Sequence, residues 1–542
     1  MSYIKIWSGN LEEKDRPLAD SIHFAFSKDH MTWENLHQGY GILFASAIVL
    51  EDNTLEERSL VNPKLMQKEN EFFIFAECVN LSGEKTNPEE ILLWKTADFL
   101  EFEDCGLVER KVYPEYDTVC SQMTEIPEEL EESIRRRWLP IQSIAVEIPE
   151  TVCISTVSDL QEIKAKVIYN DGSEDWKRII WNTEILEGKT EGEYEVTGTV
   201  TEHSYGFPLT TGHGDPVLFK WKGFWYYIAT SDNTDDVGFF VRKADTPEAL
   251  FEPGIEEFCI LDYDEEKDRV QTFWAPEFHV IGGELYLLFA LGGKAWAPQS
   301  FIMKLKKDGE ICKAEDWEEP VRIRMMDGTY LADVSEHSIT LDMTFFRGKQ
   351  SSYYAWSWRG HIGTPLDSGS MIYVATVDEA NPYQLTSEPM LLTRPVYNWE
   401  NRGRTINNEG PYPLILEDTL YLMYSGGSAN GESYAVGYMK ANLKDDLLQL
   451  SSWKKAPTPI MFSEFVPEIY GPGHNSIYRD EDGKIWNAYH AKRSDTDELR
   501  CAAITRIHVD KEGYPVFSMS KEQDLKEGLR DVCVKVRFSE KK

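Results

Sequence analysis

Residues 406–424 read INNEGPYPLILEDTLYLMY, and one carboxylate, Glu409, precedes two short apolar runs in this stretch. An acidic pair separates the two runs, so the pattern predicts a strand, a turn and a second strand. A comparable hairpin follows a single ionisable residue at four other places, namely Asp215, Glu277, Asp342 and His474. The steps along this series of five are 62, 65, 67 and 65 residues. A nearly constant period of this kind indicates a repeat architecture.

The residue types of the repeat indicate antiparallel β-blades rather than helical repeats. Aromatic residues make up 12% of the chain, and the hairpins are rich in Tyr, Phe and Trp and close with Gly or Asp turns. Five such units predict an all-β fold with a five-bladed β-propeller, whose inner strands line a central channel. The five ionisable side chains are therefore predicted to meet at one end of that channel. One such acid alone would be an ordinary solvated turn residue, and the shared spacing is what favours a site.

Composition limits the partners of this 542-residue chain. Its formal net charge of −37 disfavours nucleic acid and anionic membrane surfaces, because both would repel it. No apolar run approaches the roughly 20 residues of a membrane-spanning helix. The eight cysteines include no CxxC pair, and the opening stretch MSYIKIWSGNLEEKDRPL lacks the basic and apolar segments of a signal peptide. We therefore predict a cytoplasmic protein with an uncharged substrate, bound to neither nucleic acid nor membrane.

Residues 1–140 are predicted to form an N-terminal β-rich region. Within it, Asn62-Pro63 precedes a hairpin that resembles the one after Asp215-Pro216, with an amide in place of the carboxylate. An amide cannot act as a general base, so we interpret the region as a degenerate copy of propeller blades. An independent binding module is the alternative. Residues 126–138 predict a short helix with Thr124 as its cap, because acids crowd its first turn and arginines its last.

Residues 141–202 predict a small all-β unit, and residues 203–542 the propeller with its C-terminal closing strands. The pieces VIYNDGSEDWKRIIWN (167–182) and GEYEVTGTV (192–200) resemble a bacterial immunoglobulin-like domain of group 4. Such domains are generally spacers, so we expect no catalytic role for this Ig-like β-sandwich.

Five phrases of the predicted propeller together resemble the successive blade motifs of glycoside hydrolase family 43. They are GHGDPVLF (212–219), FWAPEFH (273–279), SITLDMTFF (338–346), NNEGPYPL (407–414) and YGPGHNSIYRDEDGKIWNAYHAK (470–492). The resemblance implies a five-bladed propeller enzyme that hydrolyses glycosidic bonds with inversion at the anomeric carbon. It also implies Asp215 as general base, Asp342 as the group that modulates the acid, and Glu409 as general acid. In an inverting enzyme the acid and base lie roughly 6.5 to 9.5 Å apart.

The resemblance also implies residues that contact the substrate. Trp274 is predicted to stack on a sugar ring, although a buried blade tryptophan is the alternative. Arg500 is predicted to approach the substrate pocket, with a surface ion pair as its alternative, and His213 and His490 to line the pocket. Glu277 falls within the WAPE phrase, where the family rarely uses the glutamate to carry a proton.

His474 resembles a histidine that helps relatives to hold a calcium ion in the channel, mostly through water. We therefore expect one Ca²⁺ next to His474 and no organic cofactor, with a hydrogen-bonded core histidine as the alternative. The segment from Glu409 to the YHAK phrase resembles the α-L-arabinofuranosidase branch of the family most. The prediction is an exo-acting enzyme that releases terminal α-L-arabinofuranosyl residues from an oligosaccharide. A β-xylosidase or arabinanase of the same fold, and a carbohydrate-binding propeller without catalysis, remain alternatives.

Overall fold

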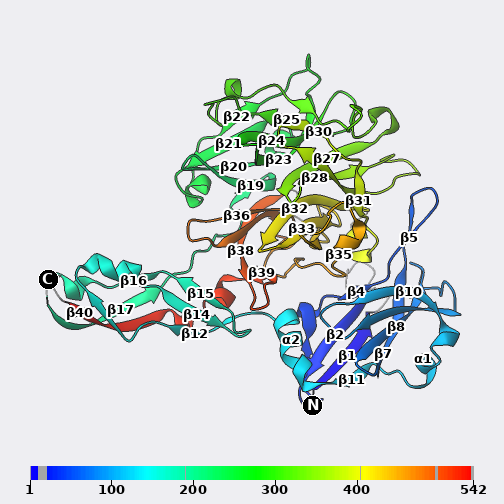
Figure 1. Cartoon of the computed structure of the whole chain (residues 1–542), viewed down its shortest axis with the longest axis horizontal. Helices are drawn as coiled ribbons and strands as arrows, with labels where there is room; N and C mark the ends of the chain where they lie inside the picture. The colour runs from blue at the N-terminus through cyan, green and yellow to red at the C-terminus, as the bar shows by residue number, and fades with distance from the viewer. Residues whose placement is uncertain (1, 10–20, 190, 403–404, 495–498, 539–542) are drawn as a thin grey trace. The chain divides into compact units, whose positions relative to one another are not determined.

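The computed structural model describes residues 2–9, 21–189, 191–402, 405–494 and 499–538 (Figure 1). Residues 10–20, which belong to the opening stretch discussed above, lie outside this description. The chain forms two compact units. The first contains residues 1–128 and 206–504, and the second contains residues 129–205 and 505–542.

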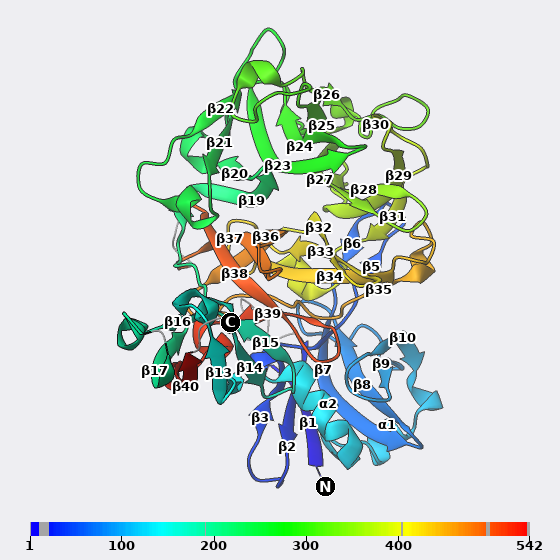
Figure 2. The same cartoon turned by 60° about the vertical axis from the view of Figure 1, so that its left-hand side comes forward.

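Most of the first unit is a ring of antiparallel sheets (Figure 2). Blade I contains β19 (His213–Trp221), β20 (Phe224–Ser231), β21 (Phe239–Ala244) and β22 (Phe258–Leu261). Blade II contains β23 (Gln271–Ile281), β24 (Glu284–Gly292), β25 (Gln299–Lys304) and β26 (Val321–Arg322). Blade III contains β27 (Ile339–Arg347), β28 (Ser352–Arg359), β29 (Met371–Asp378), β30 (Asn381–Leu385) and β31 (Met390–Thr393). Blade IV contains β32 (Asn408–Leu416), β33 (Thr419–Gly426), β34 (Ala435–Asn442) and β35 (Trp453–Lys455).

Blade V closes the ring with a strand from the other end of the propeller segment. It contains β36 (Tyr470–Arg479), β37 (Ile485–Lys492), β38 (Cys501–Val509) and the short β18 (Thr210–Thr211). Strand β18 pairs with the start of β38, which joins the first and last parts of the propeller. The inner strands β19, β23, β27, β32 and β36 contact one another in that order around the ring, and β36 returns to β19. The predicted five-bladed β-propeller is confirmed.

Every inner strand carries a two-residue irregularity near its start. The ladder to the second strand skips two residues there, and the first skipped residue has a positive φ in each case. The left-handed backbone turns this residue out of the regular alternation of the strand. The equivalent residues, with their φ angles, are Asp215 (52°), Ala275 (45°), Asp342 (55°), Gly410 (59°) and His474 (48°).

This equivalence corrects the series of five ionisable residues that the sequence suggested. Only Asp215, Asp342 and His474 occupy the same position in their blades. Glu409 lies one residue before the position held by Gly410, and Glu277 lies two residues after Ala275. The five residues share an approximate spacing because blade lengths are similar, but they do not share a backbone position.

Apolar side chains fill the space between neighbouring blades. Between blades I and II, for example, the ring of Phe239 packs edge-on against Phe273 and Phe289, and all three are buried. Both faces of the inner hairpins are covered, which explains why strands such as β24 and β33 are almost wholly buried rather than alternating.

The N-terminal region contributes two more sheets to the first unit. One contains β11 (Met123–Ile126), β1 (Ser2–Ser8), β2 (Ser21–Ser27), β3 (Glu34–Asn35) and β4 (Leu43–Phe44). The other contains β7 (Ser59–Lys68), β8 (Glu71–Val79), β9 (Glu90–Thr96) and β10 (Glu103–Glu109), with the short helix α1 (Glu115–Thr118) following it in the chain. A small hairpin of β5 (Ile48–Val49) and β6 (Leu55–Glu56) lies between the two sheets in sequence.

The second N-terminal sheet repeats the inner-hairpin geometry of a blade. The ladder between β7 and β8 skips two residues at Asn62-Pro63, and Asn62 has a φ of 53°. The region also shares a hydrophobic core with blade IV, where the ring of Tyr40 stacks on Phe462 at a centroid distance of 4.2 Å. The interpretation as degenerate blades stays a prediction.

Helix α2 (Glu128–Trp138) confirms the helix predicted near residues 126–138. Thr124 lies inside β11 and pairs with Ile4, so it is not the cap of this helix. In the described part of the chain, no helix has the length and hydropathy needed to cross a membrane. All eight cysteines are free thiols.

The second unit has two small sheets. One contains β12 (Ser143–Glu147), β14 (Ala165–Tyr169) and β15 (Glu174–Lys177), and the other contains β13 (Thr151–Ile154), β40 (Asp531–Phe538), β17 (Gly192–Val200) and β16 (Ile179–Trp181). The C-terminal strand β40 lies between β13 and β17 (Figure 2). It therefore completes this unit, whereas the sequence boundary at residue 203 assigned it to the propeller region. The kinship of this unit with group 4 Ig-like domains stays a prediction.

Candidate active site

Asp215 is held at the start of β19 by partners from its own blade and from blade V. Its side chain is 5% exposed, and Oδ1 lies 3.2 Å from Nδ1 of His474 and 3.1 Å from Nη1 of Arg500. Its Oδ2 accepts a hydrogen bond of 2.5 Å from the hydroxyl of Thr230. Burial alone would raise the pKa of Asp215, but the charges of His474 and Arg500 outweigh it and hold that pKa well below its usual range. Asp215 is thus an ionised carboxylate with a fixed orientation.

Arg500 connects Asp215 to the end of β20. Its Nε lies 3.1 Å from Oδ1 of Asp232, and its backbone N–H donates to Oδ2 of the same residue at 3.1 Å. Gly214 has to be a glycine here, because a Cβ would lie 2.1 Å from the guanidinium carbon. Arg500 is therefore a partly buried ion-pair partner of Asp215, with a side chain only 13% exposed, rather than a surface arginine.

Asp342 occupies the equivalent position in blade III, where its surroundings favour the protonated acid. It is 1% exposed, and its Oδ2 accepts hydrogen bonds from Ser357 Oγ at 2.9 Å and from the N–H of Gly410 at 3.1 Å. Burial, reinforced by the charges of Glu409 and Asp215 and only partly opposed by His474, raises the pKa of Asp342 to about 7. Two aspartates with the same backbone position therefore have pKa values shifted in opposite directions.

Glu409 is the most accessible of the three carboxylates and comes from blade IV. Its Oε1 accepts a hydrogen bond of 2.8 Å from the hydroxyl of Tyr434. The ring of Tyr434 stacks on His490 at 5.2 Å and 8°, and Nδ1 of His490 lies 3.2 Å from Asp215. A chain of contacts through the stacked rings of Tyr434 and His490 thus connects Glu409 with Asp215.

His474 lies between the acidic groups, and these groups favour its protonated form. Burial lowers the pKa of His474, but the nearby carboxylates, Asp215 first among them, outweigh burial and raise it. Its ring also covers Gly410, where a Cβ would lie 3.2 Å from the imidazole. In the described residues, no three His, Cys, Asp or Glu side chains are grouped so that they could hold a metal directly. Binding of calcium next to His474 therefore stays a prediction.

Glu277 is buried in β23, two residues after Ala275, which holds the position equivalent to Asp215. It is 3% exposed, and its Oε2 lies 2.7 Å from Nε2 of His279. Its charge still acts on His474, as one of the four carboxylates that raise that histidine's pKa. Glu277 therefore acts electrostatically on His474, while its own hydrogen-bond partner is His279.

Trp274 and His213 flank the acidic cluster without contacting a carboxylate of it. The indole of Trp274 donates to Asp236 at 2.8 Å, and its ring meets the half-exposed Trp296 edge-on at 6.4 Å. His213 comes two residues before Asp215, but its Nδ1 lies 3.0 Å from the hydroxyl of Tyr227 and its ring lines a separate pocket of blade I.

The sequence analysis missed the side chains that hold the carboxylates in place. Thr230 and Ser357 occupy equivalent positions on the second strands of blades I and III, and each donates to the aspartate of its own blade. Ser425 pairs with Glu409 at the equivalent position of blade IV. A search for hydroxyl residues about 15 positions after each acid could have found this pattern. Tyr434 reaches Glu409 only through the fold of blade IV and offered no comparable sequence pattern.

Comparisons with known proteins agree with this architecture. The family model "Glycosyl hydrolases family 43" matches residues 205–515. An alpha-L-arabinofuranosidase from Lactobacillus brevis of known structure is 28% identical, with a TM-score of 0.51, and the match covers 58% of this chain and 96% of that one. An extracellular exo-alpha-(1→5)-L-arabinofuranosidase from Streptomyces avermitilis is 28% identical over 61% of this chain and 65% of its own length. Alpha-L-arabinofuranosidase B from Pyricularia oryzae is 28% identical over 58% of this chain and 63% of its own.

The names of these relatives correct one prediction and leave others open. The Streptomyces avermitilis relative and a second one from Streptomyces chartreusis are named extracellular enzymes, which contradicts the cytoplasmic location predicted from the sequence. The chain spans just under two thirds of the length of the first curated relative it matches. The family model covers more than half of the chain, and the five blades with their three carboxylates lie within the matched residues. The chain therefore belongs to glycosyl hydrolases family 43.

Proposed function

We propose that the protein is an inverting, exo-acting glycoside hydrolase that releases terminal α-L-arabinofuranosyl residues from arabino-oligosaccharides or arabinose-decorated glycans. The observation that carries the proposal is a set of three carboxylates from three blades with different surroundings. Asp215 is ionised beside two cations, Asp342 is buried with a raised pKa, and Glu409 is accessible and oriented by Tyr434. Glycosidic hydrolysis needs carboxyl groups in different protonation states. The names of the relatives support the choice of sugar.

In the proposed reaction, Asp215 is the general base. Its low pKa keeps it ionised at neutral pH, and Thr230 and Arg500 fix the direction of its two oxygens. It takes a proton from water as the water oxygen forms its bond to the anomeric carbon. Because the attack comes from the face opposite the leaving group, the configuration at that carbon inverts.

Glu409 is the proposed general acid, which donates its proton to the departing oxygen as the glycosidic bond breaks. Asp342 acts on it through the backbone, because the N–H of the next residue, Gly410, donates to Asp342. The two carboxyl groups also interact electrostatically, because the charge of Glu409 is one of those that raise the pKa of Asp342. We therefore assign Asp342 a positioning and modulating role rather than direct contact with the reacting atoms.

The test is hydrolysis of aryl α-L-arabinofuranoside and aryl β-D-xylopyranoside by the purified chain, with the general-base variant Asp215→Asn alongside. We expect a strong arabinofuranoside signal that the variant loses, and proton NMR of the first product formed should show the inverted anomer. A preference for the xyloside would identify a β-xylosidase with the same machinery. Cleavage only inside polymeric arabinan would identify an arabinanase, and binding of sugars without any hydrolysis would identify a non-catalytic propeller.

A further inference from the structure

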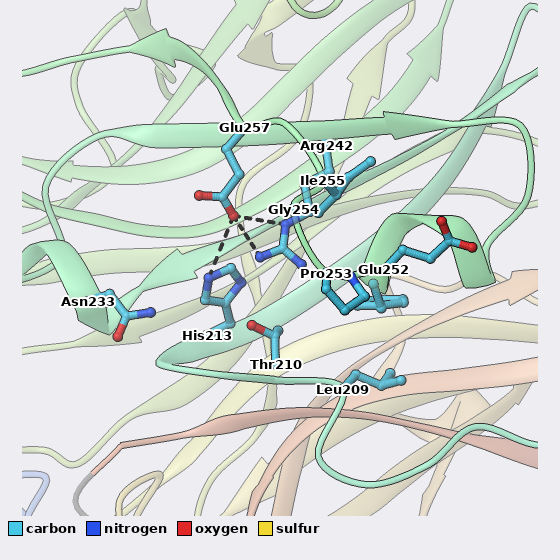
Figure 3. A pocket seen from close by; sticks show the side chains of 11 residues that line it. Leu209, Thr210, His213, Asn233, Arg242, Glu252, Pro253, Gly254, Ile255 and Glu257 are labelled. Carbon is cyan, nitrogen blue, oxygen red and sulfur yellow. Dashed lines mark hydrogen bonds and ion pairs between the residues drawn. The ribbon is translucent and has the colours of Figure 1, made fainter.

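A pocket of about 510 Å³ lies on blade I, apart from the three carboxylates (Figure 3). Its walls come from β18, the start of β19, the turn after β20, β21 and the segment before β22. This volume falls in the range of roughly 300 to 1,000 Å³ that small-molecule sites occupy. None of the proposed catalytic groups lines it, so its polar side chains need another explanation.

Glu257 is the centre of the polar groups in this pocket. Its Oε1 accepts a hydrogen bond of 2.8 Å from Nε of Arg242. The same oxygen forms an ion pair with Nη2 of Arg242 at 2.7 Å and lies 4.0 Å from Nε2 of His213. Figure 3 shows that these contacts all meet at one of its two oxygens. Arg242 also donates to the carbonyl of Leu250 at 3.3 Å. Within the described residues, the second oxygen of Glu257 remains available as an acceptor for a ligand.

His213 presents a donor to the same space. Burial raises the pKa of Tyr227, so its hydroxyl keeps its proton and can donate to Nδ1 of His213. Burial and the neighbouring Arg242 lower the pKa of His213 to about 4, so the ring is neutral at pH 7. A neutral ring that accepts at Nδ1 carries its proton on Nε2, which faces Glu257 and the pocket.

The remaining walls suit the apolar face of a sugar ring. Phe251 and Ile255 are half-buried, and Pro253 is exposed at the rim. Neutral sugars combine apolar C–H faces with vicinal hydroxyls that both donate and accept hydrogen bonds. The exposed carboxylate of Glu252 on the same wall, and the net charge of −37, disfavour an anionic ligand.

Hydrogen bonds connect the backbone of this pocket to Arg500, the ion-pair partner of Asp215. Asn233 donates to the carbonyl of Thr211 at 2.9 Å, and the N–H of Gly212 donates to the carbonyl of Arg500 at 2.7 Å. Gly212 has a φ of 78°, and a Cβ there would lie 2.1 Å from Asn233, so the close approach requires glycine. The pocket wall and the ion-pair partner of Asp215 therefore form one rigid segment.

We propose that the blade I pocket is a second sugar-binding subsite, which holds a neutral sugar unit of the oligosaccharide other than the one released. This inference rests on the proposed function for its substrate, and the pocket itself can be tested without it. Glu257 and His213 recognise hydroxyls, Arg242 orients Glu257, and Phe251 with Pro253 contacts the apolar face.

The test compares Glu257→Gln with Glu256→Gln, which makes the same charge change one position away and outside the pocket. Pro253→Phe is the second pocket variant, because it narrows the rim while leaving the Arg242–Glu257 pair intact. We measure KM and kcat on α-1,5-arabinotriose and on aryl α-L-arabinofuranoside. For both pocket variants we expect the loss of kcat/KM on the trisaccharide to exceed that on the aryl glycoside about tenfold, through KM. Glu256→Gln should show no such difference, and equal losses on both substrates would overturn the proposal.

Calorimetry with the Glu409→Gln variant measures sugar binding to the pocket independently of hydrolysis. It also distinguishes a sugar unit of the substrate from a free monosaccharide as the occupant of the pocket. Titration with arabinotriose, arabinose, xylose and glucose reads binding whether or not the wild type hydrolyses any of them. Trisaccharide affinity that drops about tenfold on adding Glu257→Gln supports a subsite for the substrate. A second equivalent of free monosaccharide that Glu257→Gln removes would show a site for free sugar and overturn the substrate subsite. If Glu257→Gln leaves the affinity for every one of these sugars unchanged, the pocket is not a sugar site, even if the protein proves to be a glycosidase.

Discussion

The hairpin at Asn62 and the hairpin at Asp215 have the same backbone and opposite chemistry. Both skip two residues in the ladder, both place a left-handed residue before proline, and the φ angles are 53° and 52°. Glu77 in β8 occupies the pairing position that Thr230 holds in β20. In blade I the carboxylate comes from the first strand and the hydroxyl donor from the second. In the N-terminal sheet the amide of Asn62 donates to the carboxylate of Glu77 at 2.7 Å.

The exchange changes what each site can do. Lys85 and Arg110 contact Oε1 of Glu77 at 2.9 and 3.3 Å. Burial alone would raise the pKa of Glu77, but the hydrogen bonds from Lys85 and Asn62 outweigh it and lower that pKa. Its carboxylate is therefore a structural ion whose charge is balanced by Lys85 and Arg110. Backbone geometry positions a side chain, and the identity of that side chain and its charged neighbours decides whether chemistry follows.

The largest effect should come from giving blade I the amide of the N-terminal hairpin. We expect Asp215→Asn to lower kcat/KM on aryl α-L-arabinofuranoside by a factor on the order of 10³, because an amide cannot take the proton from water. The Thr230 hydroxyl can still donate to the amide oxygen, so circular dichroism should report an intact fold. The reciprocal change, Asn62→Asp, serves as control and should leave kcat/KM as it is. A loss of less than tenfold in Asp215→Asn would contradict its role as base.

The next largest effect should come from Glu409, the proposed general acid. Glu409→Gln should lower kcat by a factor on the order of 10² to 10³ on natural oligosaccharides, whose leaving groups need protonation. On aryl glycosides with activated leaving groups the loss should be far smaller. Steady-state kinetics on a series of leaving groups measures the difference, and equal losses across the series would rule out the acid role.

A smaller effect should appear in stability at alkaline pH. The folded-state pKa of Asp342 is raised to about 7 from an ordinary value of 3.8, so the folded protein binds this proton more tightly than the unfolded chain. Asp342 therefore costs stability progressively as pH rises from about 4 to 7. Asp342→Asn keeps an oxygen for Ser357 and removes that cost. We expect its Tm relative to wild type to be higher at pH 8 than at pH 5 in calorimetry, and a pH-independent difference would contradict the raised pKa.

The smallest effect should come from Glu77, with the opposite pH dependence. Its folded-state pKa is lowered, so its contribution to stability is present above an ordinary pKa of 4.5 and is lost as pH falls below it. Glu77→Gln should destabilise the chain by about 1 kcal/mol at pH 7, since Lys85 and Arg110 are partly exposed and solvent screens the pairs. Denaturant titration at pH 7 and at pH 3.5 should show a smaller difference at the lower pH. An equal difference at both would show that packing, and not charge, sets the cost.

Local pattern in the sequence was enough to predict the repeat and to nominate three carboxylates for the proposed site. Hairpins of fixed period, rich in aromatic residues, determine a propeller because each blade buries its faces only against its neighbours. The same phrases located Asp215, Asp342 and Glu409. The period alone also gathered Glu277 with the others, because a spacing of about 65 residues cannot resolve a shift of one or two positions along a strand. The ladder irregularities resolve that shift, and they depend on cross-strand pairing.

Tertiary structure decided the charges and the partners of these residues. Asp215 and Asp342 have the same backbone setting, and their different ionisation comes from Arg500 and His474 on one side and from burial on the other. His213 is only two residues from Asp215 in sequence, yet its ring lines the blade I pocket. Strand β40, which the sequence grouped with the propeller, completes the second unit between β13 and β17. Sequence patterns record what a residue is and how often its setting recurs, whereas electrostatics and strand pairing depend on groups hundreds of residues away.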